Sequence, residues 1–394
     1  MSRNGVKQPG RHLARRVPII AAVAAVALAP GIPAVGAPST PGAVPVPLPI
    51  RGVLNDVAML SARSGWAVGR SGVCNPKTLI ARWDGTSWKR VPLPANGRHG
   101  WLDGVAATSA SNAWAVGIPG SDKGKALMLR WNGSDWTRVR LPRSKGLTQL
   151  VGIAATSAAN AWAVGTANDG SSLILHWNGR TWTRVPSPGR DSFLSGVAAT
   201  SARNAWAVGL TGGSNSGLIL HWNGTAWTRV PVVGLPKGTV LYRVAAVSAR
   251  AAWAVGSTSD EKAVIVRWNG TTWRRVKTPV KAGVLIGITA LSGRDAWAAG
   301  ATSDNISGCA GVSALAPGLG DHDRPAARNL SPLILHWNGH RWQLVKNPSL
   351  PAGAGLVGIT ATSARRAWAV GGAGDNLGPK AKALVLHWNG KRWQ

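Results

Sequence analysis

Side chains able to carry out chemistry are few in this chain. Its 394 residues include 45 Lys and Arg but only 14 Asp and Glu, and the formal charge is +31. Glu261 is the only glutamate, and there is one Tyr and one Phe. Mechanisms built on paired carboxylates or on phenol groups therefore have few candidates. The composition favours a non-catalytic protein over an enzyme, and we predict no cofactor.

The densest group of metal-ligand types is Asp321-His322-Asp323. Two carboxylates could hold a hard cation, which makes Asp321 and Asp323 weak candidates for a metal site. Gly and Pro flank the triplet, so a solvated loop is the alternative. Cys74 and Cys309 are the only cysteines. In an oxidising compartment they could form one disulfide, although sequence alone does not fix the distance that the bond requires.

The first 37 residues predict a removable signal peptide. A basic stretch precedes an apolar run at residues 17–29, and small residues at 35–37 suit cleavage. The run is short for a membrane span, which takes about 20 residues, so we expect no transmembrane segment after cleavage. Arg15-Arg16 leaves both the general secretory and the twin-arginine route open. The abundance of Arg, Ala and Gly is typical of proteins from bacteria with a high GC content. We expect a secreted or envelope-associated protein.

The spacing of the tryptophans shows that the chain consists of internal repeats. Seven units of three account for 21 of the 22 Trp, and only Trp101 lies outside them. The first Trp of each unit is Trp66, Trp114, Trp162, Trp206, Trp253, Trp297 and Trp368. The second is Trp83, Trp131, Trp177, Trp222, Trp268, Trp337 and Trp388, and the third follows five residues later.

Each unit divides into four short β segments, named A to D. Segment A is small and aliphatic, B reads Ala-Trp-Ala-Val-Gly, C ends at the second Trp, and D begins at the third. Asn-Gly or Asp-Gly between C and D is a hairpin signal. Four antiparallel strands repeated seven times match a β-propeller. We therefore predict an all-β, seven-bladed propeller over residues 51–394, with a loop inserted in blade 6 at residues 303–331.

The two ends of the chain are predicted to complete one blade together. The seventh unit stops at Trp393-Gln394, where the other units continue into the rest of segment D. The Pro-rich segment 38–50 resembles that missing piece, so we expect it to pair with blade 7 and close the ring. A Pro-rich linker behind the signal peptide is the alternative.

The repeat resembles degenerate kelch repeats of the galactose-oxidase type of β-propeller. Segment B ending in Gly, the hydrophobic segment C and Trp-Thr-Arg-Val-Pro carry the resemblance, with Gly371-Gly372 as the one double glycine. The resemblance implies the fold. The copper oxidases of that family use a tyrosine joined to a cysteine, a second tyrosine and histidines. With Tyr242 as the only tyrosine, this site cannot be assembled.

Recurrence separates packing residues from candidate binding residues. Tryptophans that recur in every blade suit packing between blades, as do His176, His221, His336 and His387, which precede the second Trp. One histidine per blade cannot converge on a single metal ion. Trp101 breaks the pattern, beside His99 in what we predict to be a loop, and is the candidate aromatic for ligand contact.

Arginines recur in the predicted A–B turns, which should lie at the mouth of the central channel. Guanidinium groups with few acids nearby attract anions and bind phosphate or carboxylate through two hydrogen bonds. The predicted anion-binding set is Arg63, Arg203, Arg250, Arg294, Arg365 and Arg366. A second set, on segment D, suits edge protection.

These features favour an exported binding or scaffold propeller that attaches to anionic envelope polymers through its Arg-rich face. One alternative is a protein-interaction propeller with incidental charge. Another is a polysaccharide hydrolase or lyase that uses the opposite loop face. No motif for sequence-specific nucleic-acid binding is visible.

Overall fold

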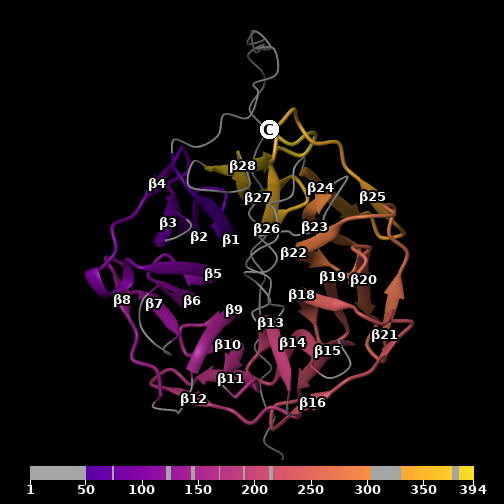
Figure 1. Cartoon of the computed structure of the whole chain (residues 1–394), viewed down its shortest axis with the longest axis horizontal. Helices are drawn as coiled ribbons and strands as arrows, with labels where there is room; N and C mark the ends of the chain where they lie inside the picture. The colour runs from indigo at the N-terminus through magenta and orange to yellow at the C-terminus, as the bar shows by residue number, and fades with distance from the viewer. Residues whose placement is uncertain are drawn as a thin grey trace, which may run out of the picture. The chain divides into compact units, whose positions relative to one another are not determined.

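Seven antiparallel β-sheets surround one axis in the computed structural model, each with its first strand innermost (Figure 1). The structure describes residues 50–72, 75–120, 126–142, 147–167, 169–189, 191–212, 216–302, 330–374 and 381–394. The predicted seven-bladed, all-β propeller is confirmed. Its blades are numbered 1 to 7 in chain order.

In blades 1 to 6, strands A to D coincide with the four predicted segments, whereas blade 7 has strands A to C and an isolated bridge between Trp388 and Trp393 in place of strand D. The inner strands A are β1 (Val53–Ser61), β5 (Gly100–Ser109), β9 (Leu147–Ser157), β13 (Ser192–Ser201), β18 (Val240–Ser248), β22 (Val284–Ser292) and β26 (Gly355–Ser363). Strands B are β2 (Ser64–Ser71), β6 (Asn112–Pro119), β10 (Asn160–Ala167), β14 (Asn204–Thr211), β19 (Ala251–Ser257), β23 (Asp295–Thr302) and β27 (Arg366–Ala373).

The outer strands are shorter. Strands C are β3 (Lys77–Trp83), β7 (Leu127–Trp131), β11 (Ser172–Trp177), β15 (Ser216–Trp222), β20 (Ala263–Trp268), β24 (Ser331–Trp337) and β28 (Lys382–Trp388). Strands D are β4 (Trp88–Arg90), β8 (Trp136–Arg138), β12 (Trp182–Arg184), β16 (Trp227–Arg229), β21 (Trp273–Val276) and β25 (Trp342–Leu344).

Two connections carry additional structure. A short 3-10 helix, η1 (Ala95–Gly97), precedes blade 2, and β17 (Val232–Val233) adds a parallel fifth strand beside β21. No helix within the described ranges has both the length and the apolar character of a membrane span.

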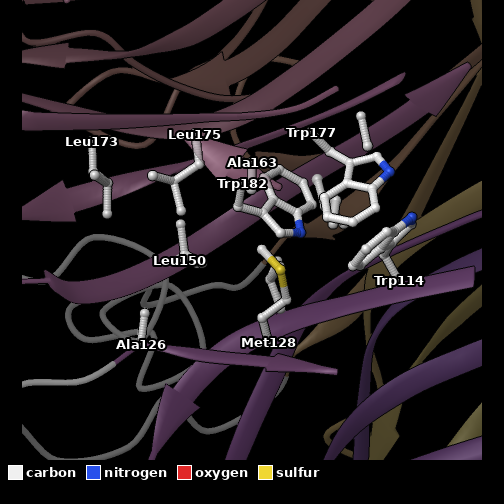
Figure 2. Close-up of a cluster of buried hydrophobic side chains, with 12 residues drawn as sticks. Trp114, Ala126, Met128, Leu150, Ala163, Leu173, Leu175, Trp177 and Trp182 are labelled. Atoms are coloured by element: carbon white, nitrogen blue, oxygen red, sulfur yellow. The ribbon is translucent and has the colours of Figure 1, made fainter. Parts of the chain in front are cut away.

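Indole rings fill the space between neighbouring blades. Trp114 of blade 2 is fully buried, with its ring centroid 5.1 Å from both Trp177 and Trp182 of blade 3 (Figure 2). The first Trp of every blade from 1 to 6 packs in this way on the second and third Trp of the next. At the remaining junction, Trp368 shares a cluster with Trp83 and Trp88. The predicted packing role of the recurring tryptophans is confirmed.

Residues 50–52, the first that the structure describes, and Gln394 at the C-terminus both pair along β28 and close the ring. Ile50 accepts a hydrogen bond from the backbone N–H of Ala383, and Gly52 donates one to Ala381. At the other end of the strand, Gln394 and His387 exchange backbone hydrogen bonds. The last residue of the predicted closing segment therefore pairs with blade 7, while residues 38–49 lie outside the described ranges.

Every strand A contains a β-bulge at the same place. In blade 4, Leu194 pairs with Gly209 and Gly196 with Val208, which leaves Ser195 as the extra residue. The bulge brings backbone so close to Gly209 that a Cβ there would lie 1.8 Å from the carbonyl oxygen of Phe193. This explains why segment B ends in glycine. A bulge redirects side chains, and here it aims them at the axis.

The indole packing predicts a large loss of stability on truncation. We expect Trp206→Ala to lower the free energy of unfolding by about 3–5 kcal/mol, because Trp206 is fully buried between Trp268 and Trp273. Leu344→Ala, at a side chain that is 58% exposed, should change it by less than about 0.5 kcal/mol. Urea unfolding followed by circular dichroism measures both, and equal effects would contradict the packing assignment.

Candidate functional site

The A–B and C–D turns lie together on one face of the propeller, as predicted. In every blade the second Trp, at the end of strand C, donates its indole N–H to a carbonyl oxygen of the A–B turn. In blade 1 the bond runs from Trp83 to Ala62 over 2.9 Å. The other six donors are Trp131, Trp177, Trp222, Trp268, Trp337 and Trp388. These bonds hold the two turns of each blade in fixed positions.

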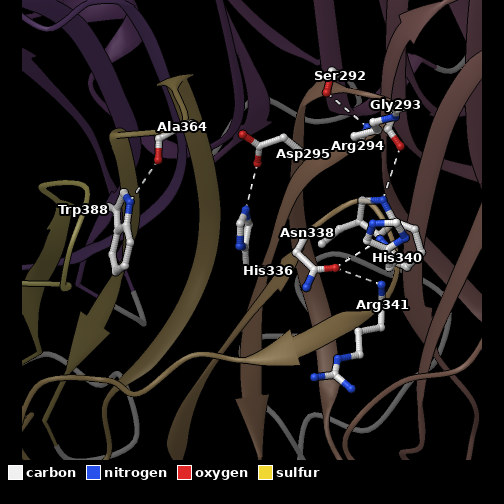
Figure 3. Close-up of polar contacts among 11 residues, drawn as sticks. Ser292, Gly293, Arg294, Asp295, His336, Asn338, His340, Arg341, Ala364 and Trp388 are labelled. Carbon is white, nitrogen blue, oxygen red and sulfur yellow. Dashed lines mark hydrogen bonds and ion pairs between the residues drawn. The ribbon is translucent and has the colours of Figure 1, made fainter.

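The C–D turns share one geometry, set by their first residue. In blade 6 the side-chain oxygen of Asn338 accepts hydrogen bonds from the backbone N–H groups of His340 and Arg341 (Figure 3). Asp84 or Asn does the same in every other blade. The glycine that follows has positive φ, for example 96° at Gly339. Each turn therefore presents its last two residues to solvent.

All six predicted anion-binding arginines are exposed in this part of the molecule. Their stems lean over the C–D turns, however, rather than towards the channel. A Cβ at Gly390 would lie 3.1 Å from Cβ and Cγ of Arg365, and Arg63, Arg203, Arg250 and Arg294 cover the equivalent glycines. Five of the predicted cations thus lie across their blades, away from the expected position around the channel mouth.

This packing concentrates charge on two neighbouring blades. Blade 6 carries Arg294 and Arg341 on these turns, and blade 7 carries Arg365, Arg366, Lys391 and Arg392. Arg294 and Arg365 lie over the C–D glycines of their blades. We call these six exposed residues the blade 6–7 patch. The acid in these turns, Asp295, accepts a hydrogen bond from His336 at 2.9 Å (Figure 3). Sequence reasoning missed the C–D members of the patch, whose signal was their basic character at the two positions after Asn-Gly.

The arginine arrangement is interrupted elsewhere on this face. Blades 2 and 3 carry Ser111 and Ala159 at the A–B turn position that is arginine in the other five blades. Blade 2 also presents Asp135 on its C–D turn. The face is therefore asymmetric, with its cations concentrated on blades 6 and 7.

The histidines before the second Trp have a packing role. The rings of His176, His221 and His336 stack on the first Trp of their own blades at about 4 Å. In blades 1, 2 and 5 the guanidinium groups of Arg82, Arg130 and Arg267 cover the same indoles. Burial lowers the pKa of His176 and His221. The ranges that the structure describes contain no group of three potential metal ligands.

Trp101 is the second residue of β5, so its predicted position in a loop was wrong. It is half-buried, and the guanidinium of Arg70 from blade 1 lies 5.8 Å from its ring centroid. Its indole nitrogen is buried without a hydrogen-bond partner. Cys74, Cys309, Asp321 and Asp323 all lie outside the described residues. The disulfide and the weak metal site therefore stay predictions.

A second candidate site lies on the axis, where the bulges of strands A meet. In five blades the second residue of the bulge is glycine, because strands A of neighbouring blades touch there. At Gly287, for example, a Cβ would lie 2.6 Å from the carbonyl oxygen of Val357. Blades 1 and 5 instead place Asp56 and Arg243 at this position. Sequence reasoning missed both residues, although each breaks the repeat at one aligned position.

Two acids lie at the axis on blades 1 and 2, of which Asp103 is fully buried and Asp56 is half-buried. Both oxygens of Asp56 accept backbone hydrogen bonds, from Val57 at 2.9 Å and from Val105 of blade 2 at 3.0 Å. One oxygen of Asp103 accepts from the side-chain amide of Asn55 at 3.2 Å. Its other oxygen is buried without a partner. These bonds join blade 1 to blade 2 at the centre of the ring.

Arg243 reaches to this pair from blade 5. Its guanidinium donates to the backbone carbonyls of Ser195 at 2.7 Å and of Asp103 at 2.6 Å. Burial raises the pKa of Asp103 to about 7, although the charges of Arg243 and Arg70 oppose the shift. Burial also raises the pKa of Asp56, against the same opposing charge of Arg243. The axis therefore holds a carboxyl group that titrates near neutral pH.

A pocket of about 230 Å³ adjoins this cluster. Strands A of six blades line it, and its polar members include Asp56, Arg243, Thr289 and Thr360. Next to the bulges, Val151, Tyr242, Ile286 and Val357 form an apolar cluster with Val284. The axis thus holds an apolar cluster and, beside it, a pocket lined in part by the guanidinium of Arg243.

Comparison with known proteins identifies the fold and no family. The chain matches no protein-family model. It matches none of the curated proteins either. Among solved structures it is similar to YCF48 from Cyanidioschyzon merolae, with 17% identity, a TM-score of 0.58, and coverage of 88% of this chain and 99% of that one. A structure of YCF48 bound to D1 peptide gives 15% identity, a TM-score of 0.54, and coverage of 89% and 99%.

A third similar structure is the BP39L lectin from Burkholderia pseudomallei. It has 11% identity, a TM-score of 0.58, and coverage of 87% of this chain and 98% of that one. At these identities the likeness concerns the β-propeller fold alone. The relation to kelch repeats of the galactose-oxidase type stays a prediction.

The raised pKa of Asp103 predicts a pH-dependent stability that Asp103→Asn removes. The folded state holds the proton up to about pH 7, whereas the ordinary value is 3.8. The stabilisation is therefore complete below that ordinary value and is lost as the pH rises through about 7. We expect wild type and variant to unfold alike at about pH 4, and the variant to be more stable by roughly 1–4 kcal/mol at about pH 8.

Chemical unfolding at several pH values measures this difference. The lowered pKa of His176 and of His221 has the opposite effect on stability, but both residues are present in both proteins, so the comparison cancels them. Asp135→Asn, which removes an exposed carboxylate from a C–D turn, is the control and should follow wild type. A constant difference between wild type and Asp103→Asn across this range would contradict the assignment.

Proposed function

We propose that this protein is an exported, non-catalytic binding propeller that attaches to anionic polymers of the cell envelope through the blade 6–7 patch. The observation that carries the proposal is that the A–B and C–D turn regions of two adjacent blades carry six exposed cations, with Arg294 and Arg365 lying over the C–D turns. The acid of these turns is engaged by His336.

Polymers rich in phosphate, sulfate or carboxylate suit this surface. Arginine binds such groups through paired hydrogen bonds, and a cluster of cations raises the local concentration of anions. The turns are fixed by the hydrogen bonds of Trp337, Trp388, Asn338 and Asn389. Because the backbone under the cations is already ordered, binding costs mainly the entropy of the side chains themselves.

A protein partner is the second candidate function. The observation that favours it is the similar propeller structure described as YCF48 bound to D1 peptide. A partner bound through apolar contacts would be retained at high salt, whereas a polyanion would be released. Salt dependence therefore separates the two functions.

We expect the protein to bind heparin with an affinity that falls steeply as NaCl rises. The patch variant replaces four cations by Ser, at Arg365, Arg366, Lys391 and Arg392. The plot of log K against log [NaCl] should become less steep by about 3 slope units, because each cation–anion contact on a polyanion such as a nucleic acid contributes roughly 0.7–0.9 to the steepness. Fluorescence titration at several NaCl concentrations gives this slope.

The matched control removes four exposed cations from the outer strands instead, by Arg90→Ser, Arg184→Ser, Arg229→Ser and Arg275→Ser. It has the same net charge as the patch variant and should keep most of the wild-type slope. Equal losses in the two variants would show that net charge alone drives binding. Salt-insensitive retention would favour the protein partner.

A further inference from the structure

The axial pocket is lined by four residues that break the repeat. Blades 1 and 5 carry Asp56 and Arg243 at the bulge position that is glycine in the other five blades. Blades 6 and 7 carry Thr289 and Thr360 at the strand A position opposite the first Trp, where the other five blades carry alanine. Residues that recur in every blade serve packing. Four departures in one pocket therefore point to a role beyond packing.

These four residues follow one another around the axis. They come from blades 5, 6, 7 and 1, which are consecutive because blade 7 packs on blade 1. A cation thus stands at one end of the arc, a carboxylate at the other end and two hydroxyl groups between them. Blades 2, 3 and 4 carry only glycine and alanine at the same two positions.

The polar groups of the arc keep capacity for a ligand. Arg243 donates two hydrogen bonds to backbone carbonyls, although a guanidinium carries five N–H donors. Each oxygen of Asp56 accepts one backbone hydrogen bond, and a carboxylate has about four acceptor sites. The hydroxyl groups of Thr289 and Thr360 have no hydrogen-bond partner among the residues that the structure describes.

The two charged groups are held apart by bonds to the same strand. Arg243 donates to the carbonyl oxygen of Asp103, and Asp56 accepts from the backbone N–H of Val105, both on β5. These two anchor points are two residues apart, or roughly 7 Å along an extended strand. The guanidinium and the carboxylate of Asp56 form no ion pair with each other. A ligand that carries both charges can bridge them, whereas a simple anion would face Asp56 and a simple cation would face Arg243.

The remaining surface of the pocket also suits a polar ligand. Strands A pair with strands B on one side only, so their other edge presents backbone N–H and C=O groups to the axis. The extra residues of the bulges, among them Asp103, Val151 and Ile286, are almost fully buried. The pocket lies between this layer and the A–B turns. At about 30 Å³ per water molecule, its volume of about 230 Å³ corresponds to roughly seven waters.

We propose that the axial pocket binds a small polar α-amino acid. Its carboxylate would lie on Arg243, its ammonium group on Asp56, and its side-chain hydroxyl near Thr289 and Thr360. Both charged contacts are charge-assisted hydrogen bonds, which are about twice as strong as neutral ones. This site shares no residue with the blade 6–7 patch.

The probe is L-serine, titrated into the full chain and followed by isothermal titration calorimetry. We expect saturable binding at one site, and an affinity at least about tenfold lower for Arg243→Gln and for Asp56→Asn. The matched control, Arg70→Gln, removes a cation near Asp103 that does not line the pocket, and it should bind serine as wild type does. Failure of L-serine to bind the wild-type protein would overturn the proposal.

Three analogues of serine each lack one of its polar groups. 3-Hydroxypropanoate lacks the ammonium group, 2-aminoethanol lacks the carboxylate, and L-alanine lacks the hydroxyl. Each of the two singly charged analogues should bind at least about tenfold more weakly than serine, and alanine about fivefold more weakly. Undiminished binding of 3-hydroxypropanoate would show that Asp56 takes no part, and undiminished binding of 2-aminoethanol would show the same for Arg243. Either result would contradict a bridging ligand.

A variant that restores the repeat keeps the test valid if Arg243→Gln or Asp56→Asn does not fold. Thr289→Ala and Thr360→Ala together give blades 6 and 7 the alanine of the other blades, so this variant should unfold as wild type does. It should bind serine and alanine equally, because the hydroxyl of serine has lost its partners. A preference for serine that persists in this variant would place the amino acid outside the axial pocket.

Discussion

Packing of indole rings between blades is the interaction on which the rest of this structure depends. The first Trp of a blade fills the space against the second and third Trp of the next, so each sheet is buried by its neighbour. A guanidinium or an imidazole covers the same indole from strand C. Each blade contributes its first Trp to the contact with the next blade and its second and third Trp to the contact with the preceding one. All of these rings are therefore buried only when every sheet has a neighbour on both sides, as in a closed ring. Pairing of Ile50 and Gly52 with β28 completes that condition.

The same rings also fix the surface where charge collects. The indole N–H of the second Trp bonds to the A–B turn, and the Asn or Asp that follows holds the C–D turn. These turns therefore belong to the rigid part of the blade rather than to free loops. Arginine stems can pack across them, and cations far apart in sequence, such as Arg365 and Lys391, come to lie together. The basic patch is a consequence of how the blades are built.

The axis follows a different constraint. Seven inner strands approach so closely that most bulges end in glycine, yet Asp56 and Arg243 stand at that position in blades 1 and 5. Their side chains form hydrogen bonds with backbone atoms of their own and other blades, including a bond from blade 5 to blade 2. Five blades thus share glycine at this position, and two divergent blades place charged side chains there.

Repeat spacing alone predicted the number of blades, the positions of their strands, the packing role of the recurring Trp and the common face of the A–B and C–D turns. It could do so because these features repeat at fixed spacing, and local periodicity is enough to show them. Three features became visible only in the folded protein: Arg365 leans over Gly390, Trp101 lies in a strand, and Arg243 reaches Asp103. Arg365 and Gly390 meet because the A–B and C–D turns of blade 7 fold side by side, and Arg243 and Asp103 meet because the blades surround one axis. No local sequence pattern contains either proximity.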